Sequence, residues 1–404
     1  PLAAYLEQVP GVKRVTIAGS YRRRRETVGD LDILVTAARG SAVMQRFTEY
    51  QSVREVASRG GTRATVILRD GLHVDLRAVP AASYGAALHY FTGSQAHNIA
   101  VRALGLKAGL KINEYGVFRG AARIAGRTEE EVYACLDLPY IEPELRENRG
   151  EIVAAQRGEL PRLIAPADIR GDLHCHTEAS DGNDSLEAMA RAAQGLGYEY
   201  LAVTEHSRST AIANGLDARR LLRQIEAIDA LNERLAPFRI LKGAEVDILE
   251  DGGLDFPDEV LKRLDLRVCS IHSHLDLPAR RQTERILRAM DNRYFNILGH
   301  PTGRLIGQRE GNDIDLTRLF EAARDRGCFL ELNAQPQRMD LNDDACLAAK
   351  RTGVRLAVST DAHSAADLRH MRYGVDQARR GWLEKDDVIN TLPLSRLLGV
   401  LRRA

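Results

Sequence analysis

The chain has 404 residues, of which 44% are hydrophobic and 28% charged, a composition that excludes a disordered or fibrous protein. This length is too great for one ordinary core and predicts two or three domains. No apolar run approaches the roughly 18 residues of a membrane helix, and the five cysteines form no CxxC pair, so we expect a cytoplasmic protein without a membrane span or a disulfide scaffold.

The net charge of +1 conceals a difference between two parts of the chain. Residues 1–150 carry 21 Lys and Arg against 16 Asp and Glu, which leaves 36 against 40 in the remainder. Eight of the eleven histidines follow residue 150. A mildly basic first part suits contact with a phosphate backbone, and an acidic, histidine-rich second part suits divalent cations.

Short strands with little helix are predicted up to residue 80. Asp70-Gly71 separates two apolar runs and is a strong signal for a two-residue hairpin turn. The latter part of 138–166, a stretch rich in Pro, Glu and Arg, is interpreted as a linker. We expect strands at 13–19, 30–36, 63–69 and 72–77, a helix at 94–108 and a second hairpin at 111–119.

Three aspartates on two of these strands suggest a magnesium site. Asp30 and Asp32 are two residues apart and share a face of one strand, and Asp75 lies on another. Carboxylate oxygens suit Mg²⁺, and two such ions would activate an attacking hydroxyl and neutralise a leaving pyrophosphate. The preceding Gly19-Ser20 offers backbone N–H groups and a hydroxyl to a triphosphate. The alternative is an acidic pair on an exposed strand face.

From residue 170 the pattern changes to alternating strands and helices. Amphipathic stretches such as 218–234 and 315–326 separate seven apolar runs. This rhythm predicts a parallel α/β domain, and seven units suit a barrel related to the (β/α)8 type. The runs lie at 171–174, 200–204, 239–246, 266–271, 295–299, 329–333 and 354–360.

Metal-competent side chains follow almost every one of these runs. The carboxyl ends of barrel strands meet at one rim, so side chains far apart in sequence would gather there. Nitrogen and oxygen ligands without sulfur suit Zn²⁺, Mn²⁺ or Fe²⁺. Nine ligands exceed what one ion uses and imply two or three clustered ions. Such clusters act on phosphate esters. The alternative is a set of separate structural histidines. The nine are His174, His176, Asp181, His206, Glu245, His272, His300, Asp361 and His363.

The motifs DLHCHTEASDG, TEH, GAEVDI, SIHSH, LGHPTGR, LELNAQPQR and STDAH resemble the successive motifs of the PHP (polymerase and histidinol phosphatase) family over 168–404. The resemblance implies that all nine residues are ligands. Cys175, between two of them, is expected to point away. Five further residues are expected to contact substrate or support the site: Arg208, His274, Arg304, Asn333 and Arg338.

The motifs GSYRR, VGDLDIL, VDLR and YFTGSQAHNIAVRALGLKAGLKINEYGVF resemble the palm and nascent-pair-binding subdomain of family X DNA polymerases. With the PHP part, the chain resembles a bacterial family X polymerase. This implies that the three aspartates hold two Mg²⁺ ions, that Asp75 also orients the primer 3′-hydroxyl, and that Arg102 reaches template DNA. The implied dNTP contacts are Gly19, Ser20, Arg23, Gly29, Tyr90, Phe91, Gly93 and Asn98.

Two departures from the family pattern are apparent. Arg24-Arg25 stand where the family more often has a small residue and Lys, which we expect to tune rather than abolish function. The chain begins at Pro1, inside the expected first palm helix, so we expect a truncated chain without the N-terminal lyase-like and helix-hairpin-helix subdomains. Gap recognition and 5′-phosphate binding are then in doubt for this piece.

The sequence thus predicts an α+β and α/β multidomain protein. We expect a mixed-sheet palm at 1–92, a small α+β subdomain at 93–150, a linker at 151–167 and a distorted (β/α)7 barrel at 168–404. The predicted function is template-dependent DNA synthesis with a metal-dependent 3′-5′ exonuclease in gap-filling repair, using two Mg²⁺ ions and two to three Mn²⁺ or Zn²⁺ ions. We expect primer-template or gapped DNA and dNTPs as partners, and a monomer. The alternatives are a small-molecule PHP phosphatase fused to a nucleotidyltransferase, and a non-catalytic DNA-binding scaffold.

Overall fold

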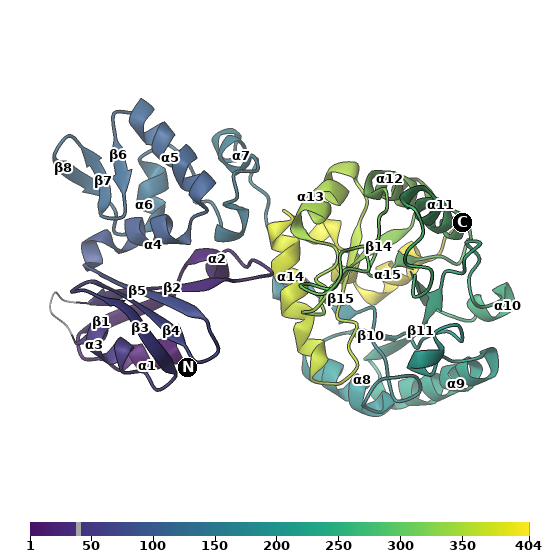
Figure 1. Ribbon diagram of the computed structural model, residues 1–404. Helices are drawn as coiled ribbons and strands as arrows, with labels where there is room; N and C mark the ends of the chain where they lie inside the picture. Colours follow the sequence, from purple (N-terminus) through teal and green to yellow (C-terminus); the bar gives the residue numbers. More distant parts are fainter. Residues whose placement is uncertain (38–41, 404) are drawn as a thin grey trace. The chain divides into compact units, whose positions relative to one another are not determined.

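The computed structural model describes residues 1–37 and 42–403 (Figure 1). The chain divides into two compact units, Pro1–Leu160 and Pro161–Ala404. The division falls within the expected linker, whose first part forms helix α7 (Glu151–Arg157) and whose last part holds the 3₁₀ turn Pro166–Asp168. No helix in the described part of the chain combines the length and apolar character needed to cross a membrane.

A five-stranded mixed sheet forms the centre of the first unit, in the order β1-β2-β5-β4-β3. β2 and β5 pair in parallel, and the other pairs are antiparallel. Asp70-Gly71 connects β4 to β5, as the hairpin signal predicted. The strands are β1 (Val12–Ile17), β2 (Asp30–Ala37), β3 (Val53–Arg59), β4 (Arg63–Leu68) and β5 (His73–Val79).

Both faces of this sheet are covered. On one face, Ile33 and Val35 of β2 pack with helices α1 (Leu2–Glu7) and α3 (Val43–Thr48). Leu34, between them on the strand, points to the other face and packs against α4 (Tyr84–Thr92). The alternation of a β-strand therefore places β2 between two apolar layers, which fixes the register of the aspartates at its start.

The rest of the first unit is small and α+β, as predicted. Ser94 caps α5 (Gln95–Lys107) by accepting a hydrogen bond from the His97 N–H at 3.2 Å. A three-stranded antiparallel sheet follows, and helix α6 (Glu129–Ala134) packs on α4. The three strands are β6 (Lys111–Asn113), β7 (Gly116–Arg119) and β8 (Ala122–Ala125).

The second unit contains a seven-stranded parallel sheet that curls into a nearly closed barrel. Its strands follow chain order from β9 to β15. The ends meet through a parallel bridge between Cys175 and Ala362, where the His176 N–H donates to the Ala362 carbonyl at 2.8 Å. The predicted (β/α)7 barrel is thus confirmed. The strands are β9 (Gly171–Asp172), β10 (Tyr200–Val203), β11 (Arg239–Asp247), β12 (Leu266–Ser270), β13 (Ile297–Leu298), β14 (Phe329–Asn333) and β15 (Leu356–Ser359).

Helices surround the barrel and close one of its ends (Figure 1). On the outside, apolar residues of each helix pack on the strands, as Leu221, Ile225 and Ile228 of α9 do. Leu397 and Leu401 of α15 (Leu394–Leu401) pack with inward residues at the amino ends of the strands. The carboxyl ends are therefore left for the site. The outer helices are α8 (Leu186–Gly195), α9 (Ala218–Leu235), α11 (Ala279–Met290), α12 (Leu316–Arg326), α13 (Asp343–Thr352) and α14 (Met371–Arg380).

Candidate metal centre and nucleotidyl-transfer site

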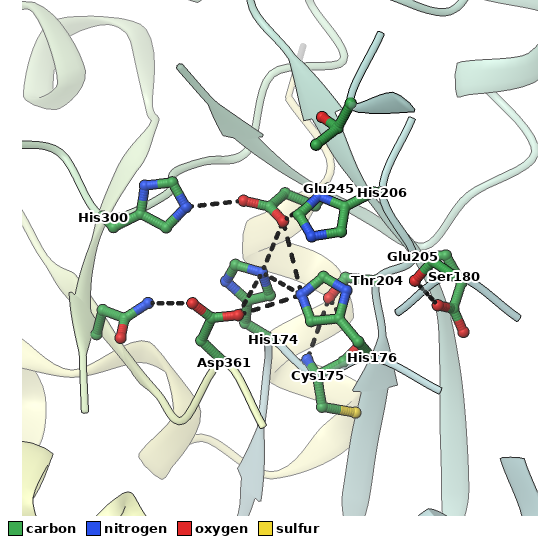
Figure 2. Close-up of polar contacts among 12 residues, drawn as sticks. His174, Cys175, His176, Ser180, Thr204, Glu205, His206, Glu245, His300 and Asp361 are labelled. Atoms are coloured by element: carbon green, nitrogen blue, oxygen red, sulfur yellow. Dashed lines mark hydrogen bonds and ion pairs between the residues drawn. The ribbon is translucent and has the colours of Figure 1, made fainter. Parts of the chain in front are cut away.

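The structure brings all nine sequence-predicted ligands together at the carboxyl ends of the barrel strands. Glu245 of β11 lies at their centre and is 1% exposed. Its Oε1 is 2.8 Å from His300 Nε2 and 3.2 Å from His272 Nε2. Its Oε2 is 2.9 Å from His206 Nδ1 and 3.4 Å from His174 Nε2 (Figure 2). One carboxylate thus contacts imidazoles from four separate segments.

A second acidic centre lies beside the first. Asp181 Oδ2 is 3.4 Å from His206 Nε2 and 3.3 Å from His363 Nε2, and its Oδ1 is 3.7 Å from His176 Nδ1. His206 therefore lies between the two acidic residues, with one ring nitrogen toward each. His176, Asp181, His206 and His363 each offer one ligand atom to a group whose atoms all lie within 4.8 Å of one another.

Asp361 completes the cluster from the loop after β15. Its Oδ1 is 3.2 Å from His176 Nε2 and 3.6 Å from His174 Nε2, while these two Nε2 atoms are 3.1 Å apart. Figure 2 shows both rings directed toward Glu245 and Asp361, and the Cys175 sulfur directed away. The strand alternation explains this, because residues i and i+2 share a face.

Two ligand histidines contact a buried carboxylate through the ring nitrogen that faces away from the cluster. Neither carboxylate was predicted from the sequence. Glu331 Oε1 is 2.7 Å from His174 Nδ1, and Asp247 Oδ1 is 2.9 Å from His272 Nδ1. Metal-ligating histidines commonly donate their second N–H to such a carboxylate, which fixes the ring and its tautomer. A usable signal was present, because Asp247 lies two residues after Glu245 on β11 and Glu331 two before Asn333 on β14.

The backbone is strained at two of the ligands. His300 has φ of 26° and Asp361 has φ of 52°, both in the left-handed region that non-glycine residues rarely adopt. Such conformations cost roughly 1–3 kcal/mol each and concentrate at functional sites, where surrounding contacts enforce them. The carboxyl ends of β13 and β15 thus turn sharply enough to direct these side chains into the cluster.

Charge coupling within the cluster shifts its pKa values in opposite directions. Burial lowers the pKa of His176 to about 4, assisted by the neighbouring His206 and His174. Burial also disfavours His206 protonation, but Glu245 and Asp181 outweigh it and raise the pKa of His206 to about 10. Although burial opposes it, the pKa of Glu245 falls well below its usual range because His206, His272 and His174 surround it.

The donor set fits divalent transition metals. Among the described residues, three buried atoms of the cluster make no hydrogen bond of good geometry: His176 Nδ1, His206 Nδ1 and Glu245 Oε2, of which the last two lie only 2.9 Å apart. Buried polar atoms without partners are costly, and a cation would satisfy them. Three overlapping groups of close ligand atoms indicate more than one ion: His176–Asp181–His206–His363, His174–His176–Glu245 and His206–Glu245–His272.

The five predicted accessory residues have different positions. The Asn333 amide donates to Asp361 Oδ2 at 3.1 Å, and Arg338 Nε lies 3.8 Å from the same atom. The Arg304 guanidinium donates to the Met339 carbonyl. His274 and Arg208 are exposed, and His274 Nε2 lies 3.8 Å from Glu250, not among the ligands. Asn333 and Arg338 therefore contact a ligand residue directly, whereas His274 does not join the cluster.

The three palm aspartates lie on neighbouring strands of the first unit. β2 and β5 pair in a register that places Asp75 opposite Asp32, and Asp30 lies two residues before Asp32 on the same face. Thr65 donates to Asp75 Oδ1, and Arg63 Nη2 lies 3.5 Å from Asp75 Oδ2. Among the described residues, these three aspartates do not form a group with ligand atoms all within 4.8 Å.

Electrostatic repulsion is evident at Asp32. Burial, with the charges of Asp30 and Asp75, raises the pKa of Asp32 to about 6. Hard carboxylate oxygens in mutual repulsion suit Mg²⁺, which would offset that repulsion. Gly19 begins the turn above this carboxylate with φ of 62°, and a Cβ there would lie 2.5 Å from Asp32 Oδ2. Only glycine allows the backbone to approach so closely.

Several predicted dNTP contacts surround the start of α5. Arg23 is buried, with Nη1 donating to the Thr92 carbonyl at 2.5 Å and Nε 3.0 Å from Glu147 Oε1, so it is engaged within the unit. Asn98 Nδ2 donates to the Tyr90 carbonyl at 2.7 Å, and Asn98 Oδ1 has no hydrogen-bond partner in the described part of the chain. The Tyr90 and Phe91 rings meet edge to face with centroids 5.1 Å apart.

The other predicted contacts in the first unit differ in exposure. Gly29 and Arg102 are exposed, and Ser20 is half-buried in the short helix α2 (Gly19–Arg22). Gly93 has φ of 68°, and a Cβ there would lie 3.2 Å from Arg23 Nη1. Gly93 is buried in the turn between α4 and α5, whereas Gly29 and Arg102 are accessible from solvent.

Comparisons with known proteins match both units. Family models described as DNA polymerase beta palm, DNA polymerase beta thumb and PHP domain match residues 2–80, 87–147 and 172–335. The DNA polymerase/3′-5′ exonuclease PolX of Bacillus subtilis (strain 168) is 40% identical over 403 residues, which are 99% of this chain and 70% of that protein.

Proteins described as probable phosphatases match about half of the chain. One from Thermoanaerobacter sp. (strain X514) is 29% identical over 231 residues, which are 54% of this chain and 89% of that protein. One from Caldanaerobacter subterraneus subsp. tengcongensis is 30% identical over 208 residues, 49% of this chain and 77% of that protein. The polymerase relative, by contrast, aligns with nearly all of the chain. The chain therefore belongs to the family X DNA polymerases that carry a PHP domain.

Proposed function

We propose that this protein is a template-dependent DNA polymerase that also removes nucleotides from DNA 3′ ends through its PHP unit. The observation that carries the proposal is the coexistence in one chain of paired strand-borne aspartates and a cluster of N and O ligands, in which seven residues form close groups and His300 and Asp361 contact them. The name of the Bacillus subtilis relative, DNA polymerase/3′-5′ exonuclease, supports assigning one activity to each unit. The substrates are then dNTPs and primer-template or gapped DNA.

In the first unit, Asp30, Asp32 and Asp75 would hold two Mg²⁺ ions. Bound there, such ions supply charge neutralisation for the triphosphate and lower the pKa of the primer hydroxyl. The protein's own contribution is positional. The adjacent strands β2 and β5 fix the three carboxylates, Gly19 and Ser20 present backbone N–H groups to phosphate oxygens, and Tyr90 and Phe91 offer apolar surface to the sugar and base.

In the second unit, the nine-residue cluster would hold two or three Mn²⁺ or Zn²⁺ ions. Such ions polarise phosphoester oxygens and activate water near neutral pH. Glu245 would be a ligand for these ions, because its two oxygens face different histidines. Arg338, half-buried beside Asp361, and the exposed Arg208 would bind phosphate oxygens. Removal of a 3′-terminal mismatch followed by resynthesis suits a role in gap-filling repair.

Two double variants test this assignment. Asp30→Ala with Asp32→Ala should abolish dNTP incorporation on a primer-template and leave 3′-end removal within about twofold of the wild type. His174→Ala with His176→Ala should do the reverse. Each variant serves as the folding control for the other, because each retains one measurable activity. Loss of both activities in both variants, with folding intact, would refute independent sites.

The phosphatase-like relatives favour one alternative, a small-molecule phosphomonoesterase in the second unit. The test compares release of phosphate from p-nitrophenyl phosphate with release of nucleotides from a 3′ end. We expect kcat/KM for the DNA end to exceed that for the small ester by at least about a hundredfold. A higher kcat/KM for the small ester than for the DNA end would identify the second unit as a small-molecule phosphatase.

A further inference from the structure

A buried arginine lies outside the ligand cluster but holds the two loops that support one of its ligands. Arg285 of α11 is 2% exposed and is among the largest fully buried side chains. Its Nε donates to the Leu249 carbonyl at 2.8 Å, its Nη1 to the Ser273 carbonyl at 2.9 Å, and its Nη2 to the Ile248 carbonyl. The guanidinium therefore connects the chain segments that follow β11 and β12.

Gln282, one helical turn earlier, extends this contact. It is fully buried, and its Nε2 donates to the His274 carbonyl at 3.0 Å. Its Oε1 accepts a hydrogen bond from Arg285 Nη1 at 3.2 Å, so the two side chains hold each other in place. We call Gln282 and Arg285 the α11 clamp. The residues that it holds include His274, whose φ of 53° is strained for a non-glycine residue.

The loop after β11 lies directly on this helix. Gly252 has φ of 87°, and a Cβ there would lie 2.8 Å from the Arg285 carbonyl and 2.9 Å from Arg288 Cβ. Arg288 Nη1 also donates to the Asp251 carbonyl at 2.5 Å. The position of the loop is thus set by close contact with the α11 backbone as well as by the clamp.

The clamped residues directly follow a ligand and its supporting carboxylate. Ile248 follows Asp247, Ser273 follows His272, and Asp247 Oδ1 lies 2.9 Å from His272 Nδ1. His272 Nε2 in turn lies 3.2 Å from Glu245. With a side chain 20% exposed, His272 is held less by surrounding packing than His174 or His176, which are fully buried. A shift of either loop would therefore move this ligand first.

We propose that the α11 clamp is a positioning device for the ion held by His206, Glu245 and His272. It acts through the loops that orient Asp247 and His272, and it contacts neither substrate nor ion. The inference rests on the proposed metal-dependent function of the second unit, but it concerns ion binding and is tested without activity. Loss of the clamp should weaken one ion of the cluster selectively, because the other groups include His174, His176 and His363, which lie in the segments after β9 and β15 that the clamp does not touch.

The test is equilibrium dialysis of the full chain against Co²⁺ alone, with visible absorption spectra of the bound ions. Arg285→Lys keeps the charge but loses the planar guanidinium with its fixed set of N–H donors. Gln282→Met removes one donated and one accepted hydrogen bond. We expect Arg285→Lys to weaken one ion by about tenfold to a hundredfold, the range typical of outer-shell partners, and to alter that ion's spectrum. Gln282→Met should show a smaller loss at the same ion.

Arg280→Met is the matched control, because Arg280 is exposed on the same helix; its binding and spectrum should equal the wild type. Polymerase activity and the thermal unfolding temperature report folding of each variant. Wild-type affinity for every ion in both clamp variants would overturn the proposal, and so would an equal loss at all ions. The two proposals can also fail separately. If the wild type binds Co²⁺ but cuts no DNA, and the clamp variants still lose affinity for one ion, the proposed function fails while the clamp proposal stands.

Discussion

Glu331 Oε1 and His174 Nδ1 lie 2.7 Å apart, and both side chains are fully buried. The other oxygen of Glu331 accepts the His300 backbone N–H at 2.6 Å and an Asn333 amide hydrogen at 3.2 Å. One carboxylate thus fixes the ring of one ligand and the strained backbone of another. Because burial opposes its charge, this carboxylate requires all of these donors.

Glu331→Gln should therefore impair the second unit selectively. The amide can accept only through one oxygen, so either the His174 ring or the His300 backbone loses its partner. We expect 3′-end removal and ion affinity to fall by about tenfold to a hundredfold, with dNTP incorporation unchanged. Nuclease rates are measured at increasing Mn²⁺ concentration. If the variant only binds ions more weakly, excess Mn²⁺ restores the rate; if the ligand geometry is lost, the rate stays low.

Glu321→Gln, on the exposed side of α12, is the control for removing a carboxylate from this unit. It should match the wild type in both activities. A Glu331→Gln protein with wild-type nuclease rate and ion affinity would show that His174 needs no carboxylate partner.

Gly19→Ala should damage the first unit through a steric contact. An alanine Cβ would lie 2.5 Å from Asp32 Oδ2, and φ of 62° adds strain. Either the turn or the Asp32 carboxylate must move. We expect dNTP incorporation to fall by at least about tenfold, because displacing a catalytic group by about 1 Å can cost a hundredfold. Primer-extension kinetics measure the loss.

Gly11→Ala separates the steric contact of Gly19→Ala from its backbone strain. Gly11 also has positive φ, at 84°, but a Cβ there would meet nothing within 4 Å. It should cost roughly 1 kcal/mol of stability without reducing incorporation. Equal losses of activity in the two variants would assign the effect to backbone strain alone.

The sequence was sufficient to predict the barrel because its strands are buried on both faces. Seven apolar runs matched β9 to β15, and the expected helices at 218–234 and 315–326 appear as α9 and α12. Strand β3 was missed for the opposite reason. It is an edge strand with six exposed residues of seven, so its sequence VREVASR has no apolar alternation to detect.

In the site, the positions of the ligand residues could be predicted, but the residues that contact and orient them could not. The ligand positions follow from where strands end, which local pattern reveals. Asp247 and Glu331 lie on buried strands, and only the fold shows that Glu331 holds His174, which follows β9 and is 157 residues away in sequence. The contacts of Arg23 with Thr92 and Glu147 could not be predicted either, because a run of four arginines does not show which of them is buried.

Acidification should destabilise the first unit through Glu129. Burial disfavours its charge, but Arg22 and Arg146 outweigh this and lower the pKa of Glu129 to about 2 from an ordinary 4.5. The folded state therefore binds this proton more weakly than the unfolded state. The stabilisation that Glu129 gives with its two arginines is full above pH about 4.5 and is lost as pH falls toward about 2. Such a shift of the pKa corresponds to the order of 3 kcal/mol.

Urea unfolding of the full chain, followed by a probe in the first unit, checks this between pH 2 and pH 6. Glu129→Gln should flatten the pH dependence in that window and leave Arg22 and Arg146 without a charged partner. Glu130→Gln, at an adjacent exposed position, should keep the wild-type slope. Identical slopes in all three proteins would exclude Glu129 as the source.

Metal removal should destabilise the second unit. An ion that binds only the folded state stabilises it by about 2.7 kcal/mol at a hundred times its Kd. Chelation followed by Mn²⁺ addition should therefore raise the unfolding temperature of the transition that involves the barrel. His174→Ala with His176→Ala should abolish most of this rise, whereas Asp30→Ala with Asp32→Ala should retain it. A rise that persists undiminished in the histidine variant would place the stabilising ions outside the cluster around Glu245.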